Sequence, residues 1–135
     1  MRRLTAAHCA EDGERVEVTF DPAYEDGDNT SVGYGAYEVT NGPGGHQFLY
    51  DDVRMVARGT LNSINPAWLR ISMNPATGNG GTCHGDSGGP KFLGDTGTIA
   101  AITITGDAIC RSTNVVYRLD TEAARVFLSQ YVTLP

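Results

Sequence analysis

Positive charge is the first thing that this sequence has little of. The 135 residues include a single lysine, Lys91, and the formal net charge is −6. Binding to a nucleic-acid backbone requires a basic surface, so we expect no nucleic-acid partner. No apolar run approaches the roughly 18 residues that mark a membrane-spanning helix, and no polybasic patch is present. A membrane-bound protein is therefore not expected either.

The amino-terminal residues also lack the pattern of a secretory leader. Such a leader has about 7–15 apolar residues after its basic start. Only four residues separate Arg3 from His8. From this segment we expect either a cytosolic protein or a chain whose true amino terminus is missing.

The number of cysteines is odd, so they cannot all pair within the chain. Cys9, Cys83 and Cys110 are the three present, so one thiol stays unpaired or pairs outside the chain. Three buried, reduced cysteines are the alternative. A zinc site that combines them with His84 is conceivable, but no CxxC or HxxxH spacing supports it. We expect no metal and no cofactor.

Alternating apolar and polar residues predict an all-β chain. Val16, Val18 and Phe20 alternate with polar residues, which is the pattern of a half-buried strand. Strands are predicted at 14–20, 31–40, 47–61, 68–73, 90–93, 98–105 and 115–119. One helix is predicted from Thr121, with Asp120 as its N-cap. The long glycine-rich loop at 74–90 is of the kind that carries function.

Glycines surround a serine in the segment GDSGGP, residues 85–90. A serine hydroxyl is a weak nucleophile and needs a base within hydrogen-bonding reach. It also needs backbone N–H groups that stabilise the developing oxyanion. The N–H groups of Gly85 and Ser87 have the spacing to converge on one oxygen. With the GxSxG pattern alone, a plain glycine-rich turn is the alternative.

The nucleophile elbow of α/β-hydrolases shares the GxSxG pattern, but the rest of the chain excludes it. In that fold the acid and the histidine follow the serine in chain order. His8, His46 and His84 all precede Ser87, and strands rather than a helix are predicted after it.

Two longer strings, LTAAHC at 4–9 and CHGDSGGP at 83–90, resemble the signature motifs of the chymotrypsin/trypsin family of serine peptidases, of the secreted bacterial type. The resemblance implies His8 as general base and Ser87 as nucleophile. It implies an oxyanion hole formed by the N–H groups of Gly85 and Ser87. It also implies a secreted, monomeric endopeptidase whose partner is a polypeptide substrate. The likeness is tight at 4–9 and extends over roughly 31–134.

Other segments of the chain fit the same resemblance. VGYG at 32–35 is similar to the glycine-aromatic-glycine sequence at the start of the family's second barrel. Cys83 and Cys110 match the disulfide beside its specificity pocket. Residues 103–107 correspond to the strand that pairs with the substrate backbone.

The specificity pocket is expected at Gly81 and Tyr117. By the resemblance, Gly81, six residues before the serine, corresponds to the base of the pocket and lacks the carboxylate of trypsin-like members. Cleavage after lysine or arginine is therefore not favoured. Val115 or Val116 would narrow the pocket wall, which favours a small or medium apolar side chain.

The family fold consists of two β-barrels, with the serine loop in the middle of the second. Three strands predicted before Ser87 and three after it make a complete second barrel over residues 31–135. Residues 1–30, with the His8 motif, then form a remnant of the first barrel. The expected fold is all-β: a chymotrypsin-like double β-barrel whose first barrel is largely missing, with a carboxy-terminal helix.

The acid of the triad is the member that is hardest to find. Asp52, in LYDDVRMV at 49–56, falls on the second strand of the second barrel, whereas the family's acid lies in the first. Asp26 and Asp28 are the alternatives. We favour absence of a family-type acid, because Cys9 also lacks its expected upstream partner.

This inventory leaves three functional hypotheses. The first is a serine endopeptidase with impaired catalysis. The second is a non-catalytic peptidase-like remnant that binds peptides through the strand at 98–105. The third is a chain without function, because an incomplete barrel exposes strand edges and apolar surface.

The environments of Asp86, His46 and His84 can also be predicted. In the family, the counterpart of Asp86 pairs with a buried cation, often a new amino terminus. Met1 lies too close to His8 to supply it, so the oxyanion hole is expected to be unformed, and an ordinary turn aspartate is the alternative. His46 is expected to face solvent, and His84 to contact substrate or solvent.

Overall fold

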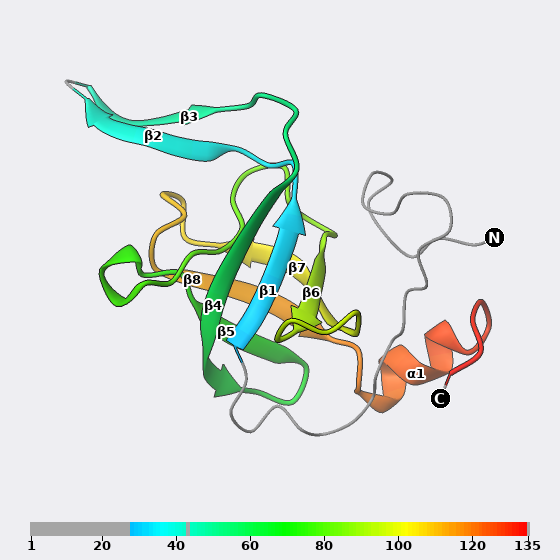
Figure 1. Ribbon diagram of the computed structural model, residues 1–135. Helices are drawn as coiled ribbons and strands as arrows, with labels where there is room; N and C mark the ends of the chain where they lie inside the picture. The colour runs from blue at the N-terminus through cyan, green and yellow to red at the C-terminus, as the bar shows by residue number, and fades with distance from the viewer. Residues whose placement is uncertain (1–27, 43, 135) are drawn as a thin grey trace.

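The computed structural model describes residues 28–42 and 44–134, in which six antiparallel strands close into a barrel (Figure 1). In order around the barrel the strands are β1 (Asp28–Gly33), β4 (Met55–Ile64), β5 (Trp68–Ser72), β8 (Thr113–Arg118), β7 (Ile99–Gly106) and β6 (Pro90–Leu93). A short 3-10 helix, η1 (Pro75–Thr77), begins the loop between β5 and β6. The predicted all-β character is confirmed for the described residues.

Two further strands form a hairpin of their own. β2 (Tyr37–Gly42) and β3 (Gly45–Leu49) pair only with each other in the described sheets, and the hairpin stands away from the barrel (Figure 1). The single long strands predicted at 31–40 and 47–61 are therefore wrong. Asp52 has a φ of 54°, which an extended strand does not allow. It lies in the exposed loop between β3 and β4, and not on a barrel strand as predicted.

The barrel interior is filled by alternate residues of neighbouring strands. Leu69 and Ile71 of β5 are fully buried, because residues two apart on a strand face the same side. Leu69 is the register partner of Val116 on β8, which is also fully buried. Ala100 and Ala101 of β7 complete this core cluster.

Helix α1 (Glu122–Leu128) follows the last barrel strand. Its N-cap is Thr121, whose side-chain oxygen accepts a hydrogen bond of 3.2 Å from the Ala124 N–H. The predicted cap, Asp120, is wrong by one residue because its carboxylate binds the guanidinium of Arg118 at 2.8 Å. Leu128 packs the helix onto a second apolar cluster near the start of β7.

Several predictions fall outside the described residues. His8, Cys9, Asp26 and the predicted strand at 14–20 belong to this group, as does nearly all of the expected first-barrel remnant at 1–30. No helix in the described part of the chain has the length and apolar character to cross a membrane.

Candidate active site

The Ser87 loop, residues 83–89, leads into β6 and is tied to β7 by backbone hydrogen bonds. The Gly88 N–H donates to the Thr103 carbonyl at 2.8 Å, and the Thr103 N–H donates to the Gly89 carbonyl at 2.9 Å. A third bond, from the Gly89 N–H to the Asp86 carbonyl at 2.9 Å, closes a turn around Ser87. The barrel thus fixes the carboxy-terminal side of the loop.

Ser87 is exposed at the tip of this turn. Gly85 precedes it with a φ of 97°, a left-handed conformation that a residue with a side chain adopts only under strain. Among the residues that the structure describes, neither the Gly85 N–H nor the Ser87 N–H donates a hydrogen bond. Two unused backbone donors next to an exposed hydroxyl are the parts that an oxyanion site requires.

Asp86 holds the amino-terminal side of the loop. Its Oδ1 accepts a hydrogen bond of 2.8 Å from the Gly35 N–H, 51 residues away in sequence, and its Oδ2 accepts one of 2.9 Å from the Cys83 N–H. A Cβ atom at Gly35 would lie 2.4 Å from the carboxyl carbon of Asp86. The glycines of VGYG therefore make room for the Asp86 carboxylate, which is more than an ordinary turn residue.

Lys91 lies behind the loop, on β6, and its side chain is fully buried. Its amino group donates a hydrogen bond to the Ser31 hydroxyl. Burial lowers the pKa of Lys91 to about 7, and the negative charge of Asp86 opposes this shift. Sequence reasoning missed this residue, although a lone lysine inside the apolar strand PKFL was a visible signal.

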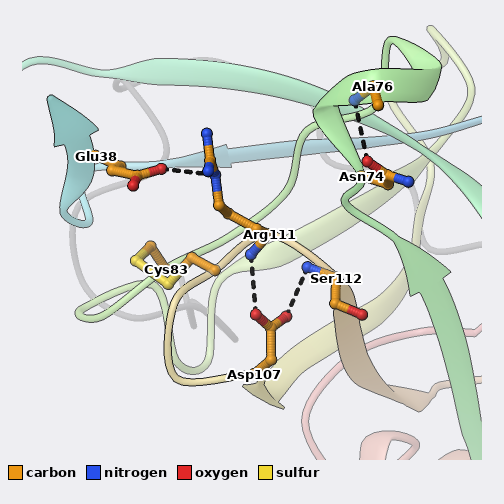
Figure 2. Close-up of polar contacts among 8 residues, drawn as sticks. Glu38, Asn74, Ala76, Cys83, Asp107, Arg111 and Ser112 are labelled. Atoms are coloured by element: carbon orange, nitrogen blue, oxygen red, sulfur yellow. Dashed lines mark hydrogen bonds and ion pairs between the residues drawn. A yellow bond between two sulfur atoms is a disulfide. The ribbon is translucent and has the colours of Figure 1, made fainter. Parts of the chain in front are cut away.

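The predicted disulfide between Cys83 and Cys110 is present. It joins the Ser87 loop to the loop between β7 and β8. Asp107 organises that second loop, because its carboxylate accepts hydrogen bonds of 3.0 Å and 2.9 Å from the N–H groups of Arg111 and Ser112 (Figure 2). Burial raises the pKa of Asp107, but these backbone bonds outweigh it and lower the pKa below its ordinary value.

In the described part of the chain, side chains of the hairpin contact the loops around the site. The Arg111 guanidinium points toward Glu38 of β2 and forms an ion pair of 2.8 Å with it (Figure 2). Phe48 of β3 packs edge-on against the His84 ring, with ring centroids 5.0 Å apart. The Nε2 atom of His84 lies 3.1 Å from the Ala108 carbonyl oxygen. The exposed His84 is thus oriented from both sides.

A cavity of about 250 Å³ lies on the inner side of the Ser87 loop. Gly81 and Asp86 line it, together with both half-cystines, but Ser87 and Tyr117 do not. Tyr117 lies on β8 with its ring against that of Trp68, at a centroid distance of 5.4 Å. The joint role of Gly81 and Tyr117 in one specificity pocket therefore stays a prediction.

Metal binding has one geometric candidate in the described part of the chain. Ligand atoms of Cys83, His84 and Cys110 lie within 4.8 Å of one another. Both sulfur atoms are joined in the disulfide. A metal is bound by thiolates, which a disulfide does not provide. This group does not fit a zinc site.

Comparison with protein-family models gave no match, and comparison with curated proteins gave none either. The likeness to serine peptidases therefore rests on the sequence motifs, with a single six-stranded barrel, one disulfide and a carboxy-terminal helix consistent with it.

Proposed function

We propose that this barrel carries the nucleophile half of a chymotrypsin-like serine endopeptidase, with Ser87 as nucleophile. The observation that carries the proposal is the build of the Ser87 loop. An exposed serine lies beside two backbone N–H groups without a partner among the described residues. Asp86 fixes that loop against a segment 51 residues earlier in the chain.

The roles follow from the chemistry of acyl transfer. Ser87 Oγ attacks the scissile carbonyl carbon, and His8 accepts the hydroxyl proton. The N–H groups of Gly85 and Ser87 bind the oxyanion of the tetrahedral intermediate. His8 then delivers the proton to the leaving amine, and water releases the acyl group from Ser87.

An extended polypeptide is the substrate that the neighbouring strand fits best. The pairing of β7 with β6 ends at Ile102, whereas its pairing with β8 continues to Gly106. Ile104 and the residues up to Gly106 are exposed. A substrate segment could pair with this part of β7 in β-strand fashion, and the Gly88–Thr103 hydrogen bond holds that strand beside Ser87.

Catalysis by this chain is proposed to be weak, because no triad acid is evident among the residues that the structure describes. Asp52 lies in an exposed loop, and its neighbour Asp51 accepts a hydrogen bond of 3.0 Å from the Tyr37 hydroxyl. The open part of β7 also supports the second candidate, a peptide-binding module without turnover.

Labelling with a fluorophosphonate tests the proposal. The purified, oxidised chain is treated with the probe and its intact mass is measured, with Ser87→Ala as the test variant and Ser112→Ala as an exposed-serine control. We expect one adduct in the wild type and in Ser112→Ala, and none in Ser87→Ala. No adduct on folded wild-type chain would refute the nucleophile role and leave peptide binding. Steady casein turnover that disappears in Ser87→Ala would contradict weak catalysis.

A further inference from the structure

The only lysine of the chain is buried on β6, the strand that follows the Ser87 loop. Lys91 on β6 is the register partner of Ser31 on β1, and these two strands lie side by side (Figure 1). The Lys91 amino group donates its hydrogen bond to the Ser31 hydroxyl. A buried ammonium group is costly unless other groups compensate its charge. The position of the nearest anion therefore matters.

Asp86 approaches the same face of β1. Ser31 and Gly33 are two residues apart on this strand, so both project toward the same side. A Cβ atom at Gly33 would lie 2.0 Å from Asp86 Oδ1. Ser31 and Gly33 lie about 6.8 Å apart along the strand, so the Lys91 amino group and the Asp86 carboxylate approach neighbouring positions on one face of β1. Ser31, Gly33 and Asp86 also line one cavity.

The other elements around Lys91 supply little charge. Its register partner on β7 is the buried Ala101, and β7 contains no ionisable residue. The ionisable residue of β1 is Asp28, three positions before Ser31. Among the described residues, Asp86 is the charged group that acts on the pKa of Lys91.

We propose that Lys91 is a positioning residue, whose ammonium group is the internal counter-ion of Asp86 and thereby holds the Ser87 loop in its reactive conformation. The hydrogen bonds that the Asp86 carboxylate accepts from the Gly35 and Cys83 N–H groups then depend on the ammonium group of Lys91 on β6. The part about reactivity rests on the proposed function, whereas the pairing of charges does not.

A pH dependence follows from the same pairing. Lys91 is charged below neutral pH and loses its proton above it, because burial lowers its pKa to about 7. The neutral amine no longer compensates Asp86. We therefore expect the bonds from Gly35 and Cys83 to Asp86 to loosen as pH rises through the neutral range.

The lone lysine allows a direct test of the charge pairing. Selective ¹³C labelling of lysine gives one side-chain NMR signal, whose chemical shift is followed with pH. In Asp86→Asn the midpoint should fall by at least about half a unit, because a nearby anion raises a lysine pKa. Asp95→Asn, at an exposed aspartate, should leave it unchanged. An unchanged midpoint in Asp86→Asn would overturn the pairing.

Amide hydrogen exchange tests the positioning role and does not require Asp86→Asn to fold. In Lys91→Met, protection of the Gly35 and Cys83 amides should fall by about tenfold or more, because each bond to a charged acceptor contributes strongly. Amides of the barrel core, such as Val116, should keep their protection. Lys91→Arg should restore part of the loss. Equal loss at all amides, or no loss, would contradict the proposal.

Ser87 reactivity completes the test. Lys91→Met should slow fluorophosphonate labelling by roughly 10²-fold, as loss of oxyanion stabilisation does elsewhere, and Lys91→Arg should shift the alkaline fall in rate to higher pH. Equal labelling rates in Lys91→Met and wild type would contradict a role in reactivity. No labelling of wild type would refute the proposed function, and the NMR and exchange results would still decide the counter-ion role.

Discussion

The Ser87 loop and the β2–β3 hairpin both connect strands of the same barrel, but different contacts fix their positions. Asp86, the disulfide and the bonds to Thr103 fix the loop from several directions. The hairpin pairs with itself and contacts the site region through side chains such as Glu38 and Phe48. Leu49, at the end of β3, is exposed. The candidate chemistry therefore lies on the part that is bonded to the barrel, and the projecting hairpin contributes contacts at its margin.

One short segment joins these two regions. Gly33 ends β1 and Gly35 donates to Asp86, and the next residue, Ala36, donates a hydrogen bond of 2.8 Å to the His84 carbonyl. β2 then begins at Tyr37. The segment that leads into the hairpin is therefore also the segment that binds the Ser87 loop. Substitutions in this segment should affect the loop more than substitutions farther along the hairpin.

Removal of the Asp86 carboxylate should have the largest effect. We expect Asp86→Ala to lower the free energy of unfolding by about 3–6 kcal/mol, because two hydrogen bonds to a charged acceptor are lost. Urea unfolding measures this change. Asp95→Ala removes an exposed ion pair with Arg58 and should change it by less than about 1 kcal/mol. Similar losses in both variants would show that Asp86 is not special.

The pH dependence of stability should come next in size. The pKa of Lys91 is 10.5 in the unfolded chain and about 7 in the folded one. Between these values the unfolded chain binds the extra proton, so stability should rise with pH, by on the order of a few kcal/mol. Lys91→Met should lack this rise. Parallel profiles in urea unfolding from pH 7 to 10.5 would contradict the burial of a titrating lysine.

A glycine pair sharpens the comparison further. The added Cβ of Gly35→Ala would meet the Asp86 carboxyl group, so we expect a loss of about 1–3 kcal/mol and slower labelling of Ser87. Gly97 has no atom within 4 Å of an added Cβ. Gly97→Ala should therefore change stability by less than about 0.5 kcal/mol. Thermal unfolding of both variants measures these losses. Equal losses of stability would argue against close packing of Gly35 on the Asp86 carboxyl group.

The smallest effect is expected in the hairpin. Glu38→Gln weakens the ion pair with Arg111, which is partly exposed, so the loss should stay below about 1 kcal/mol. Exchange of hairpin amides should quicken while the labelling rate of Ser87 stays the same. A large fall in labelling would mean that the hairpin shapes the site.

The sequence was sufficient for the parts of the fold that depend on alternation. Strands near 68–73, 90–93 and 98–105 and the helix after Thr121 lie where the apolar pattern places them. The break of the strands at 31–40 and 47–61 was not visible, because the hairpin residues continue a strand-like composition. The strand predicted at 47–61 breaks at Asp52, where the backbone adopts a positive φ.

The candidate site could be predicted in its motif but not in its support. The disulfide between Cys83 and Cys110 follows from the resemblance and is confirmed. The hydrogen bond from the Gly35 N–H to Asp86 joins residues 51 positions apart, and no local sequence pattern encodes such a contact. Lys91 was overlooked because alternation marks which residues point inward, not whether an inward position holds a charged group.

The burial of Lys91 also has a consequence for the chemistry of the whole chain. Because it is the only lysine and its side chain is fully buried, no lysine amine of the folded protein is open to reagents in solution. Acylating reagents, sugars that glycate proteins and enzymes that attach ubiquitin to lysine should find no lysine side chain to modify. Covalent change at this position would then report that the barrel has opened.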